Sequence, residues 1–152
     1  MGEILVADLE TDGLKPNRIW VVGIISMETG EYRAYVGDEE VPEGLMRLAN
    51  AERIIGHSFK SYDAQVISKL TEGLIVIDPD KIDDTVEISR ALFPNLKNHK
   101  LKTWGEILGV PKIEYTGGFD EFHEDMLPYC KRDVELNKLL YEFLLSQLEE
   151  AA

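Results

Sequence analysis

The sequence lacks most of what secreted and thiolate-metal proteins depend on. It contains 1 cysteine and 3 histidines in 152 residues, so an internal disulfide is excluded and a zinc site of cysteine and histidine is not expected. No apolar run is long enough to span a bilayer, and no charged start followed by an apolar stretch indicates a secretory signal. We therefore expect a cytoplasmic protein with no membrane partner.

Basic residues are also scarce. The chain has 16 lysines and arginines against 29 acids, a formal net charge of −13, and such a protein repels phosphate at long range. One segment departs from this balance, because residues 88–105 contain no acid. This segment is either a surface that follows a phosphate backbone or an ordinary solvated loop. Its cationic candidates are Arg90, Lys97, Lys100 and Lys102, together with His99.

Apolar residues make up 44% of the chain, which is enough for one domain, residues 1–152, with a real core. Apolar runs and turn residues predict strands at 4–8, 18–27, 31–36, 53–57 and 74–77. Helical spacing predicts helices at 42–49, 59–70, 85–92 and 101–108, and a long amphipathic helix entered near Pro128. Residues 116–118 (Thr-Gly-Gly) are expected to be the most flexible point. The order predicts an α/β fold with a mixed sheet flanked by helices.

Several acidic side chains occupy positions where strand and helix periodicity would place them on a common face. Asp8 and Glu10 end the first apolar run, and residues two apart on a strand project from one face. Tyr129 and Asp133 are four apart and share a face of a helix. Asp63 stands on the helix expected at 59–70. Carboxylates in one cleft repel each other, and hard divalent cations remove that cost.

Three segments that contain these acids resemble known motifs. Residues 8–14 (Asp-Leu-Glu-Thr-Asp-Gly-Leu), 56–63 (Gly-His-Ser-Phe-Lys-Ser-Tyr-Asp) and 129–134 (Tyr-Cys-Lys-Arg-Asp-Val) resemble the motifs of the tyrosine subclass of DEDD, or DnaQ-like, 3′→5′ exonucleases. Further segments resemble the proofreading domain of bacteriophage family A DNA polymerases; they are residues 82–85, 89–90, 95–97 and 104–109. In that family an asparagine often stands at the position of Ser58. The resemblance implies a ribonuclease H-like fold with a mixed five-stranded sheet.

The same resemblance implies two divalent cations, Mg²⁺ or Mn²⁺, and a role for each acid. Asp8 would bridge both cations, Glu10 and Asp133 would complete the site that activates water, and Asp63 would support the second cation through water. Tyr129 would orient the attacking water, because its ordinary pKa near 10 makes it a poor free base at neutral pH.

Residues expected to contact substrate lie near the first two motifs and in the basic segment. By resemblance, the backbone N–H of Thr11 would meet the terminal 3′ hydroxyl. Leu14 is either a wedge against the last base or a core residue, and Phe59 either stacks a base or belongs to the core. The expected set is completed by His57, Ser58, Lys97, Lys100 and Lys102.

The function that the resemblance implies is removal of nucleoside monophosphates from the 3′ end of DNA, preferably single-stranded, in proofreading or end trimming. Its expected partners are a DNA 3′ end and a separately encoded DNA polymerase, in a bacterial or phage-infected cell. Two alternatives stay open: a catalytically weak docking module for a polymerase, and an RNA 3′-exonuclease. A phosphatase is disfavoured, because its chemistry calls for aspartate where Glu10 stands.

Overall fold

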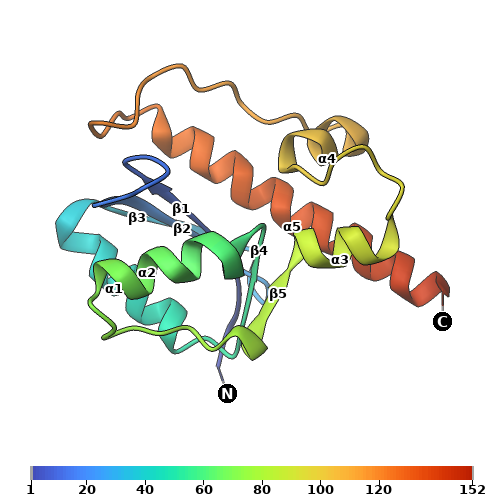
Figure 1. The fold of residues 1–152 in the computed structure, drawn as a ribbon, viewed down its shortest axis with the longest axis horizontal. Coiled ribbons are helices and arrows are strands. Elements are labelled where there is room, and N and C mark those ends of the chain that lie inside the picture. Colours follow the sequence, from blue (N-terminus) through green and yellow to red (C-terminus); the bar gives the residue numbers. More distant parts are fainter. Residues whose placement is uncertain (1, 152) are drawn as a thin grey trace.

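A mixed sheet of five strands lies at the centre of the structure, a computed structural model that describes residues 2–151 (Figure 1). The strands are β1 (Ile4–Thr11), β2 (Ile19–Ser26), β3 (Tyr32–Val36), β4 (Arg53–Gly56) and β5 (Ile82–Asp84), in the spatial order β3-β2-β1-β4-β5. The first three form an antiparallel meander, whereas β4 runs parallel to β1 and β5 parallel to β4. The expected mixed five-stranded sheet is confirmed.

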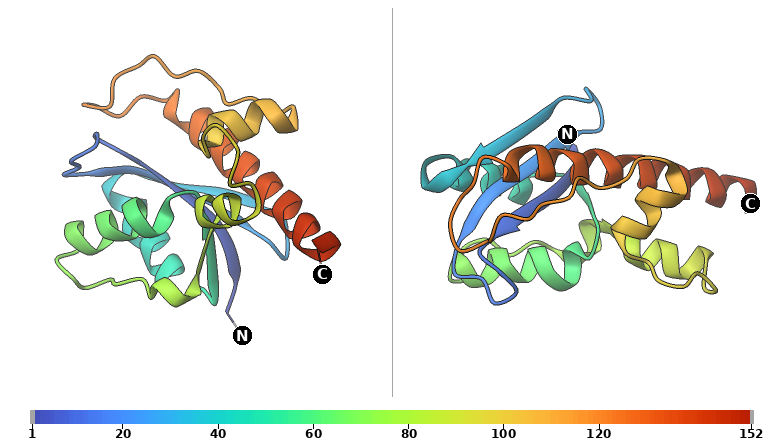
Figure 2. Two further views of the ribbon diagram at one scale, coloured as in Figure 1. Left: turned by 45° about the vertical axis from the view of Figure 1, so that its right-hand side comes forward. Right: turned by 90° about the horizontal axis from the view of Figure 1, so that it is seen from above.

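Helices cover both faces of this sheet. The helices α1 (Gly37–Ala49) and α2 (Ala64–Leu70) lie on one face, and the long helix α5 (Met126–Ala151) crosses the other and projects beyond it (Figure 2). The shorter helices α3 (Thr85–Leu92) and α4 (Leu101–Leu108) pack beside α5. Within residues 2–151, no helix combines the length and the apolar character needed to cross a membrane.

Strand alternation in β1 sorts its side chains between two cores. Leu5 and Leu9 are buried in the core that contains Leu48 of α1 and Ile67 of α2. Val6 is buried on the other face, in the core that α5 covers with Cys130 and Val134. Asp8 and Glu10 have the parity of Val6, so the alternation directs both carboxyl groups toward α5.

The prediction of the fifth strand was wrong. Residues 74–77 form an irregular connection, in which Leu74 and Val76 are exposed, and the strand next to β4 is Ile82–Asp84. Two of the three residues of β5 are acids, so no apolar run marks it. The short run at 74–77 was misleading because only Ile77 packs into the core fully.

Two helix starts also differ from the prediction. The helix expected from Pro42 begins at Gly37. Acidic side chains at positions 38–40 stabilise this start, because they interact favourably with the positive end of the helix dipole. Pro42 is accommodated inside it without an N–H to donate. The helix expected at 59–70 starts as a π-helical turn, Phe59–Asp63, and continues as α2.

The remaining helices were predicted correctly. α3 and α4 have the expected bounds, Asp84 caps α3 by accepting from the Val86 N–H, and Gly109 ends α4 with a left-handed φ of 76°. Pro128 lies in the first turn of α5, where a missing N–H costs no helical hydrogen bond. Trp104 of α4 packs with Leu140 and Leu144 of α5, which fixes the basic segment beside the long helix.

The absence of a side chain at Gly23 of β2 allows α5 to approach the sheet closely. A Cβ there would lie 2.6 Å from the Cys130 Sγ and 3.0 Å from the Tyr32 hydroxyl. We expect Gly23→Ala to lower the free energy of unfolding by about 1–3 kcal/mol, as overpacking does in a dense core, measured by urea denaturation. Gly118→Ala, where a Cβ meets open space, is the matched control. Adding Cys130→Ala should recover part of the loss; equal midpoints for Gly23→Ala and the parent would contradict this account.

Candidate active site

β1 brings the first two carboxyl groups to the α5 face of the sheet. Glu10 is 6% exposed, and Asp8 pairs across the ladder with Gly23, so no β2 side chain stands beside it. The β1–β2 register shifts between Glu10 and Thr11, which is the irregularity of a β-bulge. The strand therefore delivers two acids to the same face, just before the irregularity in its pairing with β2.

α5 supplies the other half of the site. Asp133 is 6% exposed, and Tyr129 lies one turn earlier on the same helix. The ring of Tyr129 lies 5.5 Å from that of Tyr115, centroid to centroid. The first and third motifs, more than a hundred residues apart in the sequence, thus face each other between the sheet and α5.

Asp63 reaches the same region from the π-helical turn. Its carboxyl group is buried, and its Oδ2 accepts a hydrogen bond of 3.2 Å from the backbone N–H of Leu9, between the two β1 acids. A π turn widens the backbone and changes where its side chains point, and such turns are frequent at functional sites. All four predicted acids therefore converge on the carboxyl end of β1.

Burial and mutual repulsion disfavour ionisation of these acids. Burial, and then the charge of Asp133, raises the pKa of Asp8 to about 7. Burial, and then the charge of Asp8, raises the pKa of Glu10 to about 10. The pKa of Asp133 is raised to about 6 by burial, against the lowering effect of Lys112, and burial raises that of Asp63 well above its usual value.

The donor atoms fit a divalent cation. Asp133 Oδ1 is buried and has no hydrogen-bond partner within residues 2–151, which leaves an unsatisfied acceptor on a carboxyl group whose charge raises the pKa of Asp8. One donor atom from each of Asp8, Glu10 and Cys130 lies within 4.8 Å of the others. The carboxylates are the hard oxygen ligands that Mg²⁺ and Mn²⁺ prefer. Cys130 of α5 is fully buried in the core between this helix and the sheet, so we assign its thiol to packing.

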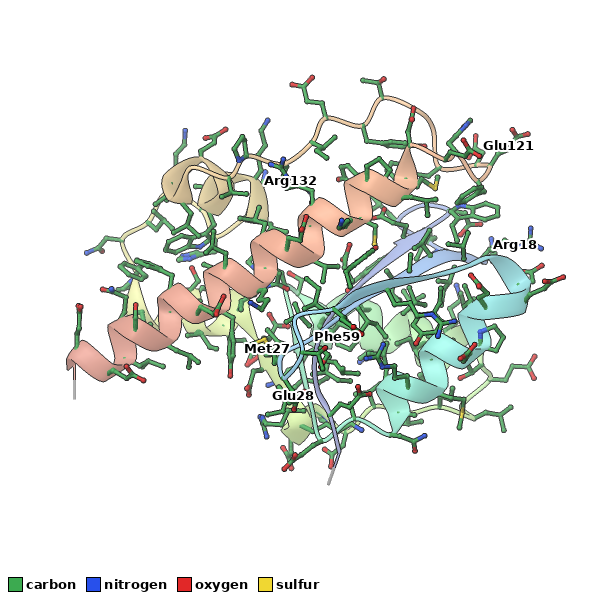
Figure 3. The ribbon with its side chains drawn as sticks, turned by 180° about the vertical axis from the view of Figure 1, so that it is seen from behind. Arg18, Met27, Glu28, Phe59, Glu121 and Arg132 are labelled. Carbon is green, nitrogen blue, oxygen red and sulfur yellow. The ribbon has the colours of Figure 1, made fainter. Side chains whose placement is uncertain are left out.

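Lys112 is the residue of the site that the sequence did not reveal. Its Nζ lies 3.4 Å from Asp133 Oδ2 and donates a hydrogen bond of 3.1 Å to the Tyr129 hydroxyl. It comes from the irregular connection between α4 and α5, which Arg132 of α5 anchors by donating to the Pro111 carbonyl (Figure 3). A single lysine after a proline carries no periodic signal, so only the fold brings it here.

A shallow hollow of about 290 Å³ lies next to Glu10. Leu14 is 94% exposed at its edge, which excludes the core alternative for this residue. Thr11 Oγ1 hydrogen-bonds the Tyr62 hydroxyl at 2.8 Å, and that hydroxyl donates to the Gly13 carbonyl. The loop that carries Leu14 is thus tied to the turn that carries Asp63.

Phe59 cannot stack on a base in this structure. Its side chain is fully buried and packs behind Gly56, where an added Cβ would come within 2.5 Å of the Phe59 Cβ; Figure 3 shows it in the interior. The expectation that it contacts substrate was therefore wrong, and the core alternative holds. Phe59 is the first residue of the π-helical turn, and its packing in the core fixes that turn. It therefore helps to position Asp63 and does not contact a substrate.

Ser58 has a backbone role that the sequence did not show. Its φ of 60° is left-handed, and its N–H donates to Asp84 Oδ1 at 3.0 Å. Asparagine adopts this conformation more readily than serine does, which gives a physical reason for asparagine at this position in the resembling family.

Most of the predicted cations line a second hollow. It has a volume of about 550 Å³ and is next to the acidic site, because Ser58 and Lys112 line it. Of the predicted lysines, Lys100 and Lys102 line it, whereas Lys97 is exposed outside it. Arg90 and Lys112 add further positive charge, and no acid contributes to the lining. A strongly acidic protein therefore has a cationic hollow beside its carboxylates.

The fold and the sequence place the chain in a known superfamily. Residues 5–120 match the RNase_H_2 family, which is described as RNase_H superfamily, so the chain belongs to the RNase_H superfamily. The expected ribonuclease H-like fold is thereby confirmed.

A DNA-directed DNA polymerase of Enterobacteria phage T3 is similar in sequence. It is 26% identical over an alignment of 194 positions that covers 94% of this chain. The chain spans 27% of the length of that polymerase, and the alignment is longer than the chain, so the polymerase has residues here that this chain lacks. The resemblance to phage DNA polymerases is confirmed.

Solved structures show the same fold. Brucella melitensis NrnC bound to pGG superposes with a TM-score of 0.76 at 24% identity, covering 99% of this chain and 76% of that one. The same protein with bound Mg²⁺ gives a TM-score of 0.75 at 21% identity, with the same coverage. The EXO domain of Aedes aegypti Nibbler gives 0.75 at 13% identity, covering 99% of this chain and 81% of that one.

Stability without metal ions should depend on pH through Asp8. The unfolded carboxyl group ionises near 3.8 and the folded one near 7, so folding takes up a proton between these values and stability from this group falls as pH rises through them. We expect metal-free Asp8→Asn to exceed the parent's free energy of unfolding by roughly 1–3 kcal/mol at pH 8. Urea denaturation with a chelator measures this, and the difference should vanish near pH 4. A constant difference across that range would contradict the raised pKa.

Proposed function

We propose that this chain is a metal-dependent 3′→5′ exonuclease that removes nucleoside monophosphates from the 3′ end of DNA, with single strands preferred. The observation that carries the proposal is the convergence of Asp8, Glu10, Asp63 and Asp133 at the carboxyl end of β1, where the buried Oδ1 of Asp133 has no hydrogen-bond partner among residues 2–151. Such a cluster is costly without cations and well matched to them. The cationic hollow beside it supplies a place for a phosphate backbone.

Each side chain has a proposed task. Asp8, Glu10, Asp63 and Asp133 hold two divalent cations, Mg²⁺ or Mn²⁺, which when bound supply charge relief at the phosphate and make water more acidic. Tyr129 donates or accepts a hydrogen bond that aims the attacking water. Lys112 holds the Tyr129 hydroxyl at 3.1 Å and so fixes its direction. Both tasks are positioning, which accounts for a large part of such catalysis.

Substrate contacts follow from the two hollows. Leu14, exposed at the edge of the smaller hollow, packs against the last base, and the Thr11 N–H meets the terminal 3′ hydroxyl. Lys100 and Lys102 contact phosphates farther along the strand, and Lys97 extends that path at the surface. Leu14 is exposed to solvent and has no packing role in the core, and an exposed apolar side chain beside the hollow supports this assignment.

The biological setting is part of the proposal. The similarity to a phage DNA polymerase supports DNA as substrate, with work in proofreading or end trimming, in the cytoplasm of a bacterial or phage-infected cell. We propose that residues 1–152 form one exonuclease domain whose partner is a DNA polymerase. An RNA substrate is the second candidate, because a solved NrnC structure with the same fold is bound to pGG.

A single degradation experiment tests the activity. Strands of DNA and of RNA labelled at the 5′ end are incubated with Mg²⁺, with Mn²⁺ or with chelator, and the products are resolved as ladders. We expect a DNA ladder that shortens one nucleotide at a time from the 3′ end, faster than RNA and absent with chelator.

Asp8→Ala should reduce the rate on the order of a thousandfold or more, since a lost ligand removes several kcal/mol of transition-state stabilisation. Ladders from Asp8→Ala at the parent's rate would refute the metal assignment, and inert DNA beside a rapid RNA ladder would favour the second candidate.

Tyr129 should matter less than the acids. Tyr129→Phe keeps the ring against Tyr115 and removes only the hydroxyl that Lys112 holds. A hydrogen bond to a charged partner contributes about 1.5–3 kcal/mol, so single-turnover cleavage should slow roughly ten- to a hundredfold. Tyr115→Phe, which keeps its ring beside Tyr129 and loses only a hydroxyl bonded to the Gly118 carbonyl, is the matched control. Cleavage by Tyr129→Phe at the parent's rate would make Tyr129 a packing residue.

A further inference from the structure

A buried chain of hydrogen bonds runs from α5 to the basic segment. Asn137, one turn after Asp133, donates from its side-chain amide to the Thr85 hydroxyl at 2.8 Å. That hydroxyl lies 2.8 Å from Nδ1 of His57, and His57 Nε2 lies 2.7 Å from the carbonyl oxygen of His99. Asn137 and Thr85 are buried, so water does not replace these bonds easily.

The chemistry of the groups sets the direction of every bond. A carbonyl oxygen only accepts, so His57 Nε2 must carry the proton that bonds His99. Burial lowers the pKa of His57 below its usual value, which leaves the ring neutral at pH 7 and makes Nδ1 an acceptor. The Thr85 oxygen therefore accepts from Asn137, and its single proton is shared between Nδ1 at 2.8 Å and the Gly56 carbonyl at 3.1 Å. Both ring nitrogens of His57 are thus used inside the protein.

The His99 ring forms a second anchor for the same loop. Its Nδ1 lies 2.5 Å from the Ser89 hydroxyl, which also accepts a hydrogen bond of 2.9 Å from the indole N–H of Trp104. Next to it, the Asn98 side-chain oxygen accepts from the Lys100 N–H and from the Thr103 hydroxyl. Residues 98–100 have no regular backbone structure, so these side-chain bonds hold them.

The loop so held carries part of the cationic hollow. Asn98, His99 and Lys100 all line it, and Lys102 follows on the first turn of α4. The hollow also contains Lys112, which contacts Asp133 and Tyr129. Any displacement of residues 98–100 therefore changes the distance between the cations of the loop and the carboxylate site.

We propose that His57 is a positioning residue: through Thr85 and Asn137 it fixes the basic loop, residues 97–100, relative to α5, and so sets affinity for the phosphate backbone of a single-stranded nucleic acid. This inference rests on the proposed function. It replaces direct contact between His57 and substrate, because neither ring nitrogen is free for one.

Two amide substitutions separate the two bonds of the ring. In His57→Gln the amide nitrogen reaches about as far as Nε2 and can still donate to the His99 carbonyl. In His57→Asn the amide oxygen stands near the place of Nδ1 and keeps the bond from Thr85, but the bond to the loop is lost. His123→Asn, an exposed histidine outside this network, is the control. Ser89→Ala is a second route to the same effect, because it releases the His99 ring and leaves His57 intact.

Two measurements are compared across these variants. Hydrogen exchange of the peptide spanning residues 97–103, followed by mass spectrometry, reports on the loop without any substrate. We expect faster exchange in His57→Asn and in Ser89→Ala, and exchange close to the parent's in His57→Gln and in His123→Asn. Degradation of a labelled single strand with Mg²⁺ should show a KM about five- to tenfold higher in His57→Asn, as the loss of one hydrogen bond predicts, with a smaller change in the saturating single-turnover rate.

The outcomes distinguish the inference from the function. If the parent degrades the strand and His57→Asn shows unchanged exchange or an unchanged KM, the inference is wrong and the proposed function stands. A His57→Gln variant as impaired as His57→Asn would also overturn it, because the bond to the loop would then not be the cause. If the parent neither degrades nor binds single strands, the proposed function fails and the inference fails with it, whatever the exchange data show.

Discussion

The constraint on which this structure depends is that four carboxyl groups share one buried space. Each would be more stable in water or far from the others, and the raised pKa values of Asp8, Glu10 and Asp133 express that cost. They stay together because each is carried by an element that is held independently. Asp8 and Glu10 are fixed by strand alternation in β1, Asp63 by a π-helical turn bonded to the Leu9 N–H, and Asp133 by α5.

The close packing of α5 on the sheet follows from the same constraint. Asp133 comes near Asp8 and Glu10 only if α5 lies low over β1 and β2. Gly23 permits this approach, because it leaves room for the Cys130 thiol directly beside the position that pairs with Asp8. The two cores on either side of β1 then stiffen the strand. A site made of mutually repelling groups thus rests on apolar packing that is dense enough to resist their separation.

The distribution of charge reconciles an acidic chain with the anionic substrate that we propose for it. The net charge of −13 acts at long range and is weakened by salt over about 8–10 Å. At contact distance, a nucleic-acid strand would meet a hollow that no acid of residues 2–151 lines. Its basic side chains are Arg90, Lys100, Lys102 and Lys112. Local charge therefore favours a phosphate backbone at this hollow, and the rest of the surface disfavours non-specific binding.

Local patterns in the sequence predicted the elements whose structure is decided locally. The parity of Asp8 and Glu10, the spacing of Tyr129 and Asp133, and the bounds of α3 and α4 all follow from periods of two or 3.6 residues. β5 was missed because its three residues owe their strand conformation to pairing with β4 rather than to their own pattern. The role of Phe59 depends on its distance from Gly56, and no spacing in the sequence encodes such a contact.

The connection between α4 and α5 shows how far a site can depend on residues without a motif. It has no regular hydrogen-bonding pattern, yet Phe119 along it lines the smaller hollow beside Glu10, and Lys112 and Tyr115 line a third hollow together with Tyr129. Side chains of its neighbours hold it: Trp20 of β2 donates to the Phe119 carbonyl and Arg132 of α5 to that of Pro111. The four acids are recognisable in the sequence as motif residues, whereas the connection that faces them is positioned mainly by tertiary contacts.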